Sequence, residues 1–272
     1  MSGTTSLRRI VSRSAVVALA GAACLAVTAG SAAAIINGSK PTEPYPFMAT
    51  IPIAAPLLGL MDGNCGAALI DAQWVVTAAH CLDMEIGSIP KGTVRIGSDE
   101  RKSGGAVRKI AQAFLHPNYV QNAPNRNDIA LVRLDRPVGI KPIKIADAAG
   151  RPGTPTRIIG FGITTFSTNP ADWKMAEKLR QLDTRRGALS ECGPGFADDT
   201  RLCTVSQKPK AMACNGDSGG PQIQRGRGGR WELIGVTSGP GAKSPSCEQG
   251  PGLYTNVPAY SAWINKTIRA NS

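Results

Sequence analysis

Glycine and proline divide this sequence into short apolar runs, and that division limits the folds open to it. The 272 residues include 31 glycines and 20 prolines, together nearly one residue in five against a usual share of about 12%. Long helices need uninterrupted stretches without these residues, so a helical bundle is excluded. Hydrophobic residues make up 42% and charged residues 18%, which excludes a wholly disordered chain and a protein with many membrane spans.

The apolar runs are a few residues long, and several are rich in valine and isoleucine, which is typical of β-strands. We predict strands at residues 67–70, 74–79, 129–134, 157–159 and 233–237. Only two segments favour helices, residues 171–179 and 258–268, the second with Pro258 at its start. The sequence therefore predicts an all-β protein with a short C-terminal helix.

The N-terminus has the three-part layout of a secretory signal peptide. Arginines at 8, 9 and 13 precede an apolar run at 15–27, and Ala32 and Ala34 satisfy the A-x-A cleavage rule. We predict a signal peptide over residues 1–34 and one mature domain over 35–272, secreted to the extracellular space. A membrane anchor is the alternative, but the Ala, Gly, Thr and Ser content makes a weak span. The arginine pair also fits twin-arginine export, and the sequence leaves that open.

Six of the seven cysteines lie after the predicted signal peptide, an even number that favours disulfides in an exported chain. They are Cys65, Cys81, Cys192, Cys203, Cys214 and Cys247. Six cysteines allow 15 pairings, so spacing leaves the connectivity open. Zinc is disfavoured, because there is no C-x-x-C and the only histidines, His80 and His116, belong to no zinc pattern. Residues 94–107 hold only Asp99 and Glu100, too few acids for a calcium site. We predict no metal and no cofactor.

The chain is basic, with 31 Lys and Arg against 19 Asp and Glu, a net charge of +12. Removing residues 1–34 deletes three arginines and leaves 28 − 19 = +9. Such a charge can favour nucleic acid, anionic surfaces or solubility alone. The tract at 225–230 (Arg-Gly-Arg-Gly-Gly-Arg) is similar to RNA-binding tracts, but it lies between two strand-like runs. We predict a charged hairpin loop there and no nucleic-acid partner.

Three segments carry side chains suited to catalysis. His80 ends a strand-like run, Asp128 enters a buried one, and Ser218 sits in the glycine-rich turn 216–221. Each has a plain structural alternative: a hydrogen-bonded histidine, an acid that caps a strand, and a tight turn. Together they supply a nucleophile, a base to take its proton and an acid to orient that base.

In sequence order His, Asp, Ser, these segments make the chain resemble the trypsin/chymotrypsin-like (S1) serine proteases. The resemblance covers residues 35 to about 268. Its matching segments are 35–38 (Ile-Ile-Asn-Gly), 77–81 (Thr-Ala-Ala-His-Cys), 128–131 (Asp-Ile-Ala-Leu), 160–162 (Gly-Phe-Gly), 216–221 (Gly-Asp-Ser-Gly-Gly-Pro), 252–255 (Gly-Leu-Tyr-Thr) and 263–264 (Trp-Ile).

The resemblance implies two six-stranded antiparallel β-barrels with the active site in the cleft between them. It implies that Ser218 attacks the scissile carbonyl, His80 carries the proton, Asp128 orients His80, and the N–H groups of Gly216 and Ser218 hold the oxyanion. It also implies the disulfides Cys65–Cys81, Cys192–Cys203 and Cys214–Cys247. We further predict, on the resemblance, a monomeric enzyme of bacterial origin that acts on polypeptides, is subject to proteinaceous inhibitors, and leaves the membrane once its signal is cut.

In the family, a new N-terminal ammonium pairs with the acid before the nucleophile; Ile35 and Asp217 occupy these positions. Because the small residues 32–34 directly precede Ile35, we hypothesise that signal peptidase creates the active terminus in one step.

The specificity pocket departs from that of the trypsin-like members, which carry an acid six residues before the serine. Here that residue is Met212, so a cationic substrate side chain finds no counter-charge. Gly252 matches a wall position that keeps the pocket open. Ser238 and Gly239 complete the predicted pocket, and Pro240 lacks an N–H for the substrate backbone. We expect a preference for apolar side chains and weakened peptide binding.

Two other classes of function stay open at this stage. One is a secreted binding protein on a protease fold with weak activity, favoured only by the altered pairing strand. The other is a hydrolase that prefers esters and uses the same acyl-enzyme chemistry.

Overall fold

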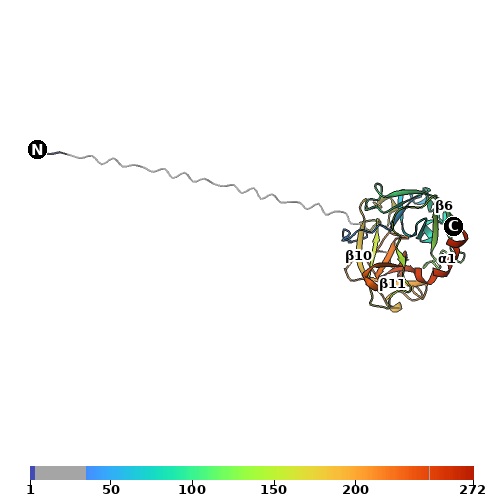
Figure 1. Cartoon of the computed structure of the whole chain (residues 1–272). Helices are drawn as coiled ribbons and strands as arrows, with labels where there is room; N and C mark the ends of the chain where they lie inside the picture. The colour runs from blue at the N-terminus through green and yellow to red at the C-terminus, as the bar shows by residue number, and fades with distance from the viewer. Residues whose placement is uncertain (4–34, 245) are drawn as a thin grey trace. The chain divides into compact units, whose positions relative to one another are not determined.

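The computed structural model describes residues 1–3, 35–244 and 246–272, apart from the side chain of Ile86. The predicted signal peptide lies almost entirely outside the described residues, so this prediction stays untested. Residues 35–244 and 246–272 belong to one compact unit, which is described below (Figure 1).

The first half of this unit is a closed antiparallel barrel. Its strands follow one another in space in the order β2-β3-β7-β6-β5-β1, and pairing of β1 with β2 closes the ring. The six strands are β1 (Met48–Ala55), β2 (Leu60–Asp71), β3 (Trp74–Thr77), β5 (Thr93–Ile96), β6 (Ala106–Leu115) and β7 (Ala130–Leu134). A two-residue strand, β4 (Ile89–Pro90), extends the edge of β1.

The second half repeats this plan, and Figure 1 labels two of its strands, β10 and β11. Its ring order is β12-β9-β10-β11-β14-β13, closed by β12 against β13. The strands are β9 (Pro155–Gly160), β10 (Arg180–Arg186), β11 (Arg201–Ser206), β12 (Pro221–Arg225), β13 (Trp231–Pro240) and β14 (Gly252–Asn256). The short β8 (Lys144–Ile145) joins β13 in parallel. The prediction of two six-stranded antiparallel barrels is confirmed, with one two-residue strand added to each.

The predicted C-terminal helix is also confirmed. It begins as a 3-10 turn, η7 (Val257–Tyr260), and continues as α1 (Ser261–Ala270), red in Figure 1. Ile264 is buried in a core shared with the first barrel. Tyr260 and Trp263 meet the ring of His116 edge to face, so His116 has a packing role. The helix therefore fastens the end of the second barrel to the first.

The remaining helices are single 3-10 turns: η1 (Pro56–Leu58), η2 (Ala79–Cys81), η3 (Met84–Ile86), η4 (Pro170–Asp172), η5 (Leu189–Glu191) and η6 (Arg227–Gly229). None of the helices in the described part of the chain is long and apolar enough to cross a membrane.

The helix predicted at 171–179 is wrong. Only the turn η4 forms there, and the following residues bond to the loop after β5 instead. Arg101 N–H donates to Glu177 C=O and Leu179 N–H to Asp99 C=O, both at 2.8 Å. Extended pairing between two loops thus replaces a helix that local propensity favoured.

The five predicted strands all lie within β2, β3, β7, β9 and β13, apart from the last two residues of the run at 74–79 and the first of the run at 129–134. The predicted charged hairpin is confirmed as well, since β12 and β13 pair antiparallel on either side of the arginine tract. Arg225 stacks 3.7 Å above the ring of Trp231 and pairs with Glu43 at 2.7 Å. This arginine is therefore engaged within the protein.

Two glycines allow the barrels to touch at the glycine-rich turn 216–221. A Cβ on Gly66, in β2, would lie 2.5 Å from the Cα of Gly220, closer than any real contact. The N–H of Gly66 also donates to Ser218 C=O at 2.7 Å. The first barrel therefore holds the glycine-rich turn 216–221 of the second barrel by backbone contact.

We predict that Gly66→Ala destabilises the fold, because the added methyl meets backbone that has no room to move. Overpacking of this kind costs about 1–3 kcal/mol, so the melting temperature should fall by at least about 2 °C in a chain of this size. Gly139→Ala is the matched control, since a Cβ there meets nothing within 4 Å. Calorimetry measures both, and equal melting temperatures for the two variants would contradict the prediction.

Candidate active site

His80 is delivered to the site by a buried strand. All four residues of β3 are buried, and the chain then turns through η2, which carries His80. The imidazole Nδ1 lies 2.8 Å from Asp128 Oδ2, and the backbone N–H of His80 donates to Oδ1 at 3.0 Å. The histidine side chain is 17% exposed and the aspartate side chain only 1%. The imidazole is therefore accessible from the surface, whereas its carboxylate partner is buried.

Asp128 collects hydrogen bonds from both barrels. The hydroxyl of Ser238, in β13, donates to Oδ2 at 2.6 Å, and the amide of Asn125 donates at 3.2 Å. The hydroxyl of Thr255 donates to the main-chain carbonyl of Asp128 at 2.7 Å. A buried carboxylate is costly unless it is bonded in this way.

Opposing effects set the protonation of this pair. Burial alone raises the pKa of Asp128, but the charge and hydrogen bonds of His80 and the bond from Ser238 outweigh it, so the pKa lies below its usual value. Burial alone lowers the pKa of His80, and the neighbouring Asp128 carboxylate reverses this and raises it. An ionised Asp128 fixes the proton on Nδ1 and leaves Nε2 as the basic nitrogen.

Ser218 lies in a turn whose shape depends on glycine. Gly216 and Gly219 have φ of +88° and +72°, values that favour glycine. A Cβ on Gly219 would lie 2.1 Å from the Thr77 hydroxyl oxygen at the end of β3. The turn is therefore pressed against the segment that carries His80, which brings the nucleophile candidate to the base.

A residue that the sequence analysis missed steadies the turn from the first barrel. Asn64 is 3% exposed, and its side-chain amide donates to Gly216 C=O at 3.1 Å. This bond orients the peptide that follows Gly216, next to one of the two predicted oxyanion donors. Asn64 directly precedes Cys65, but its partner is 152 residues away, so no local pattern indicates the contact.

Asp217 is buried between two backbone segments. Its carboxylate accepts from the N–H groups of Gly162 at 2.8 Å and Cys214 at 3.0 Å. Cβ atoms on Gly160 and Gly162 would lie 2.0 and 2.4 Å from carboxylate atoms, which explains the Gly-Phe-Gly sequence. Burial raises the pKa of Asp217 to about 7 against the effect of these bonds. Ile35 is itself fully buried, with its nitrogen in a peptide bond to the preceding residue.

The structure contains the disulfides Cys65–Cys81, Cys192–Cys203 and Cys214–Cys247. The first joins β2 to the turn beside His80. The third joins Cys214, two residues before the glycine-rich turn 216–221, to the loop before β14. Two of the three cross-links therefore brace segments that carry site residues.

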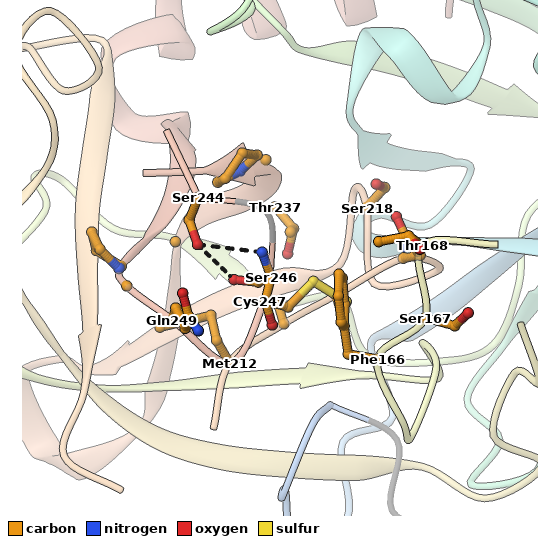
Figure 2. A pocket seen from close by; sticks show the side chains of 18 of the residues that line it. Phe166, Ser167, Thr168, Met212, Ser218, Thr237, Ser244, Ser246, Cys247 and Gln249 are labelled. Atoms are coloured by element: carbon orange, nitrogen blue, oxygen red, sulfur yellow. Dashed lines mark hydrogen bonds between the residues drawn. A yellow bond between two sulfur atoms is a disulfide. The ribbon is translucent and has the colours of Figure 1, made fainter. Parts of the chain in front are cut away.

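A cavity of about 350 Å³ ends at Ser218. Figure 2 shows Ser218 and Met212 well apart among its lining residues. Three of the four predicted pocket residues, Met212, Gly239 and Gly252, line it. A Cβ on Gly252 would lie 3.0 Å from Met212 Sδ, so glycine there leaves the methionine room. None of the described residues that line the cavity has an ionisable side chain.

The fourth predicted pocket residue, Ser238, is not among the residues that line this cavity. Its hydroxyl bonds to Asp128, and β13 bulges between Thr237 and Gly239. The cavity has walls that the sequence analysis missed, Phe166 and Trp173. Both come from the loop segment around η4, where a helix was expected in part, so they are placed by loop structure rather than by a motif. Within the described ranges, no group of three or more His, Cys, Asp or Glu side chains is arranged to hold a metal.

Two closed barrels meet where the first carries a hydrogen-bonded His80–Asp128 pair and the second carries Ser218 in a glycine-rich turn. This is the architecture of a serine hydrolase. The sequence model of the Trypsin family matches residues 35–264. Human kallikrein-7 is 32% identical over 225 residues, covering 78% of this chain and 81% of its own length. The thrombin-like enzyme acutin of Deinagkistrodon acutus is 34% identical over 220 residues, covering 76% and 86%.

Trypsin of Sarcophaga bullata is 31% identical over 244 residues, covering 86% of this chain and 89% of its own. The solved structure of mouse neuropsin, a serine protease, matches with a TM-score of 0.69 at 27% identity and covers 86% of this chain and all of its own. The chain belongs to the trypsin family and is a serine endopeptidase. These relatives are all animal proteins, so they give no support to the predicted bacterial origin.

We predict that Asp217 makes the uncleaved chain less stable as the pH rises. A carboxyl with a pKa of about 7 in the folded chain and about 4 in the unfolded chain holds its proton more tightly when folded. The free energy of unfolding therefore decreases between about pH 4 and pH 7, by up to about 4 kcal/mol. The Asp217→Asn substitution removes this decrease.

The measurement is urea denaturation at pH 4.5 and 7.5, with Ser218→Ala in both chains to prevent self-digestion. Other groups titrate in this range too, so the relevant quantity is the difference in unfolding free energy between the chain that keeps Asp217 and the chain with Asp217→Asn, taken at each pH. The same pH dependence with and without Asp217→Asn would contradict the assignment.

Proposed function

We propose that this trypsin-family enzyme cleaves polypeptides by a Ser-His-Asp acyl-enzyme mechanism and selects apolar side chains on the acyl side of the scissile bond. Ser218 attacks the carbonyl, His80 Nε2 takes its proton and later donates it to the leaving amine, and Asp128 stabilises the imidazolium. The N–H groups of Gly216 and Ser218 hold the oxyanion. The observation that carries the proposal is the bonded His80–Asp128 pair together with the uncharged cavity that Ser218 lines.

The apolar preference follows from Met212. This side chain is 3% exposed and packs with Ile35 and Tyr254 in a core of the second barrel. A guanidinium or ammonium entering the cavity would lose its water and meet no carboxylate, a penalty of several kcal/mol. Leu, Met, Phe or Tyr side chains have no such cost and would contact Trp173, Phe166 and Met212.

The strand beside the cavity would bind the acyl half of a peptide less firmly than a regular strand does. Pro240 lines the cavity and has no N–H to donate. A Cβ on Gly239 would have nothing within 4 Å, so no aromatic wall stands there. We therefore expect short peptides that occupy only this side to be poor substrates.

Export and activation are proposed as a single event. Signal peptidase cuts after Ala34 and exposes the ammonium of Ile35. The ammonium pairs with Asp217, whose carboxylate sits in a buried pocket with two N–H donors and without a cationic partner among the described residues. Pairing would lower the pKa of Asp217 and fix the turn that carries Gly216.

Paired anilide peptides that differ only in Phe or Arg at the scissile position test the specificity. We expect kcat/KM to be at least about 100-fold higher for Phe, since about 1.4 kcal/mol corresponds to each factor of ten. Met212→Asp should raise cleavage after Arg, and Ser218→Ala should abolish both activities. Faster cleavage after Arg by the unaltered enzyme would refute the apolar preference.

N-terminal sequencing of the secreted enzyme tests the activation step, and we expect Ile35 as the first residue. A form that retains Ala34 should lose activity by about 100-fold or more, the cost of disturbing an oxyanion donor. Ile35→Val keeps the ammonium and serves as the control. A fully active enzyme that begins at Ala32 or earlier would overturn the one-step hypothesis.

A further inference from the structure

Exposed apolar side chains gather at one end of the first barrel. After residue 34, eight large apolar side chains are exposed in the part of the chain that the structure describes, and five of them lie between residues 57 and 89. This apolar patch consists of Leu57, Leu58, Met61, Met84 and Ile89, with exposed fractions of 43–87%. Single exposed apolar residues are ordinary, but a cluster marks a binding surface.

Backbone contacts bring the members of the patch together. Leu57 and Leu58 form the turn η1 between β1 and β2, and Met61 follows at the start of β2. Ile89, in β4, pairs with Ala54 in β1, directly before that turn. Met84 begins η3, whose C-cap is Gly87, and a Cβ on Gly87 would lie 3.3 Å from Leu57 Cδ1. Two loops thus present one apolar surface.

Strand β2 connects the apolar patch to the predicted catalytic residues. The Cys65–Cys81 disulfide ties the strand that carries Met61 to the turn that carries His80. Gly66, the next residue in β2, bonds to Ser218 C=O. Met61 precedes Cys65 by four residues, about 13 Å along an extended strand.

The chemistry of the site determines which half of a substrate passes this way. The cavity takes the side chain of the acyl half, and its described lining comes from residues 166 to 252, outside the first barrel. His80 must reach the leaving amine to protonate it, so the leaving half passes His80 and the Cys65–Cys81 disulfide. An extended peptide advances about 3.3 Å per residue. Met61 therefore lies about four residues of extended peptide from the disulfide that the leaving half passes.

We propose that the apolar patch binds apolar side chains of an extended polypeptide substrate, about three to five residues after the scissile bond. The inference rests on the proposed peptidase function and narrows its substrates to long or unfolded polypeptides with an apolar segment on the leaving side. Binding there compensates for the acyl half, where Pro240 lacks a donor and Gly239 leaves open space. Most of the substrate affinity then comes from contacts between the leaving half of the substrate and the apolar patch.

Two internally quenched peptides test this inference. They share the acyl half and the first two leaving residues, and they carry either Leu-Ile-Leu or Ser-Gly-Ser at the third to fifth leaving positions. We expect kcat/KM to be at least about tenfold higher for the apolar peptide, a factor within reach of a few partly buried methylenes. The ratio between the peptides cancels any error in the concentration of active enzyme.

The double variant Leu57→Ser/Met84→Ser should bring this ratio close to one. Both side chains are highly exposed, at 87% and 69%, so no core packing is lost. Met61→Ser, changed alone at another exposed position, should lower the ratio in part. Leu189→Ser is the matched control, because Leu189 is an exposed leucine in η5 of the second barrel, and it should leave the ratio unchanged.

The outcomes separate this inference from the proposed function. Cleavage of both peptides with equal kcat/KM, or a ratio that survives the double variant, overturns the inference and leaves the peptidase function standing. Failure to cleave either peptide overturns the proposed function and the inference with it. A dimer in solution that the double variant converts to a monomer also overturns the inference, because a second copy would then be the occupant of the patch.

Discussion

The buried carboxylate of Asp128 is the interaction on which the two-barrel arrangement and the site both depend. It accepts from His80 in the first barrel and from Ser238 in the second, and Thr255 in β14 holds its main chain. A carboxylate at this depth costs several kcal/mol if its partners are removed. Barrels that separate or rotate would break these bonds, so the geometry of the His80–Asp128 pair is tied to the geometry of the fold.

Close backbone approach is the second constraint, and it acts where side chains have no room. Gly66 meets Gly220, and Gly219 meets Thr77, at distances that exclude a Cβ. These backbone contacts place the glycine-rich turn 216–221 against the first barrel, independently of any side-chain bond. The bond from Asn64 to Gly216 then adds a directional contact across the same junction. The turn is thus positioned by steric exclusion and oriented by hydrogen bonds.

The sequence predicted what depends on local pattern. Alternation of apolar runs with Gly and Pro indicated the strands, and the segments around His80, Asp128 and Ser218 indicated the site, because each carries its chemistry within a few residues. It failed where contacts are long-range. Residues 171–179 favour a helix locally, but pairing with the loop at 99–101 decides their structure. The bond from Ser238 to Asp128 joins residues 110 positions apart, so no local pattern indicates it. The partner of Asn64 is set by tertiary contact alone.

The net charge of +9 expected for the mature chain suggests electrostatic selection of substrates, but the site is built differently. The described lining of the cavity is uncharged, and the buried Met212 provides no counter-ion. Surface charges act through water and salt, which screen them beyond about 10 Å, whereas the cavity acts by excluding water. In the proposed function, selectivity at the scissile position therefore depends on desolvation. Under the same proposal a weakened acyl-side strand contributes little affinity, so the remaining binding energy comes from parts of the substrate remote from the reacting bond. An enzyme can use such energy to lower the barrier of the chemical step only if the substrate is long enough to reach both regions.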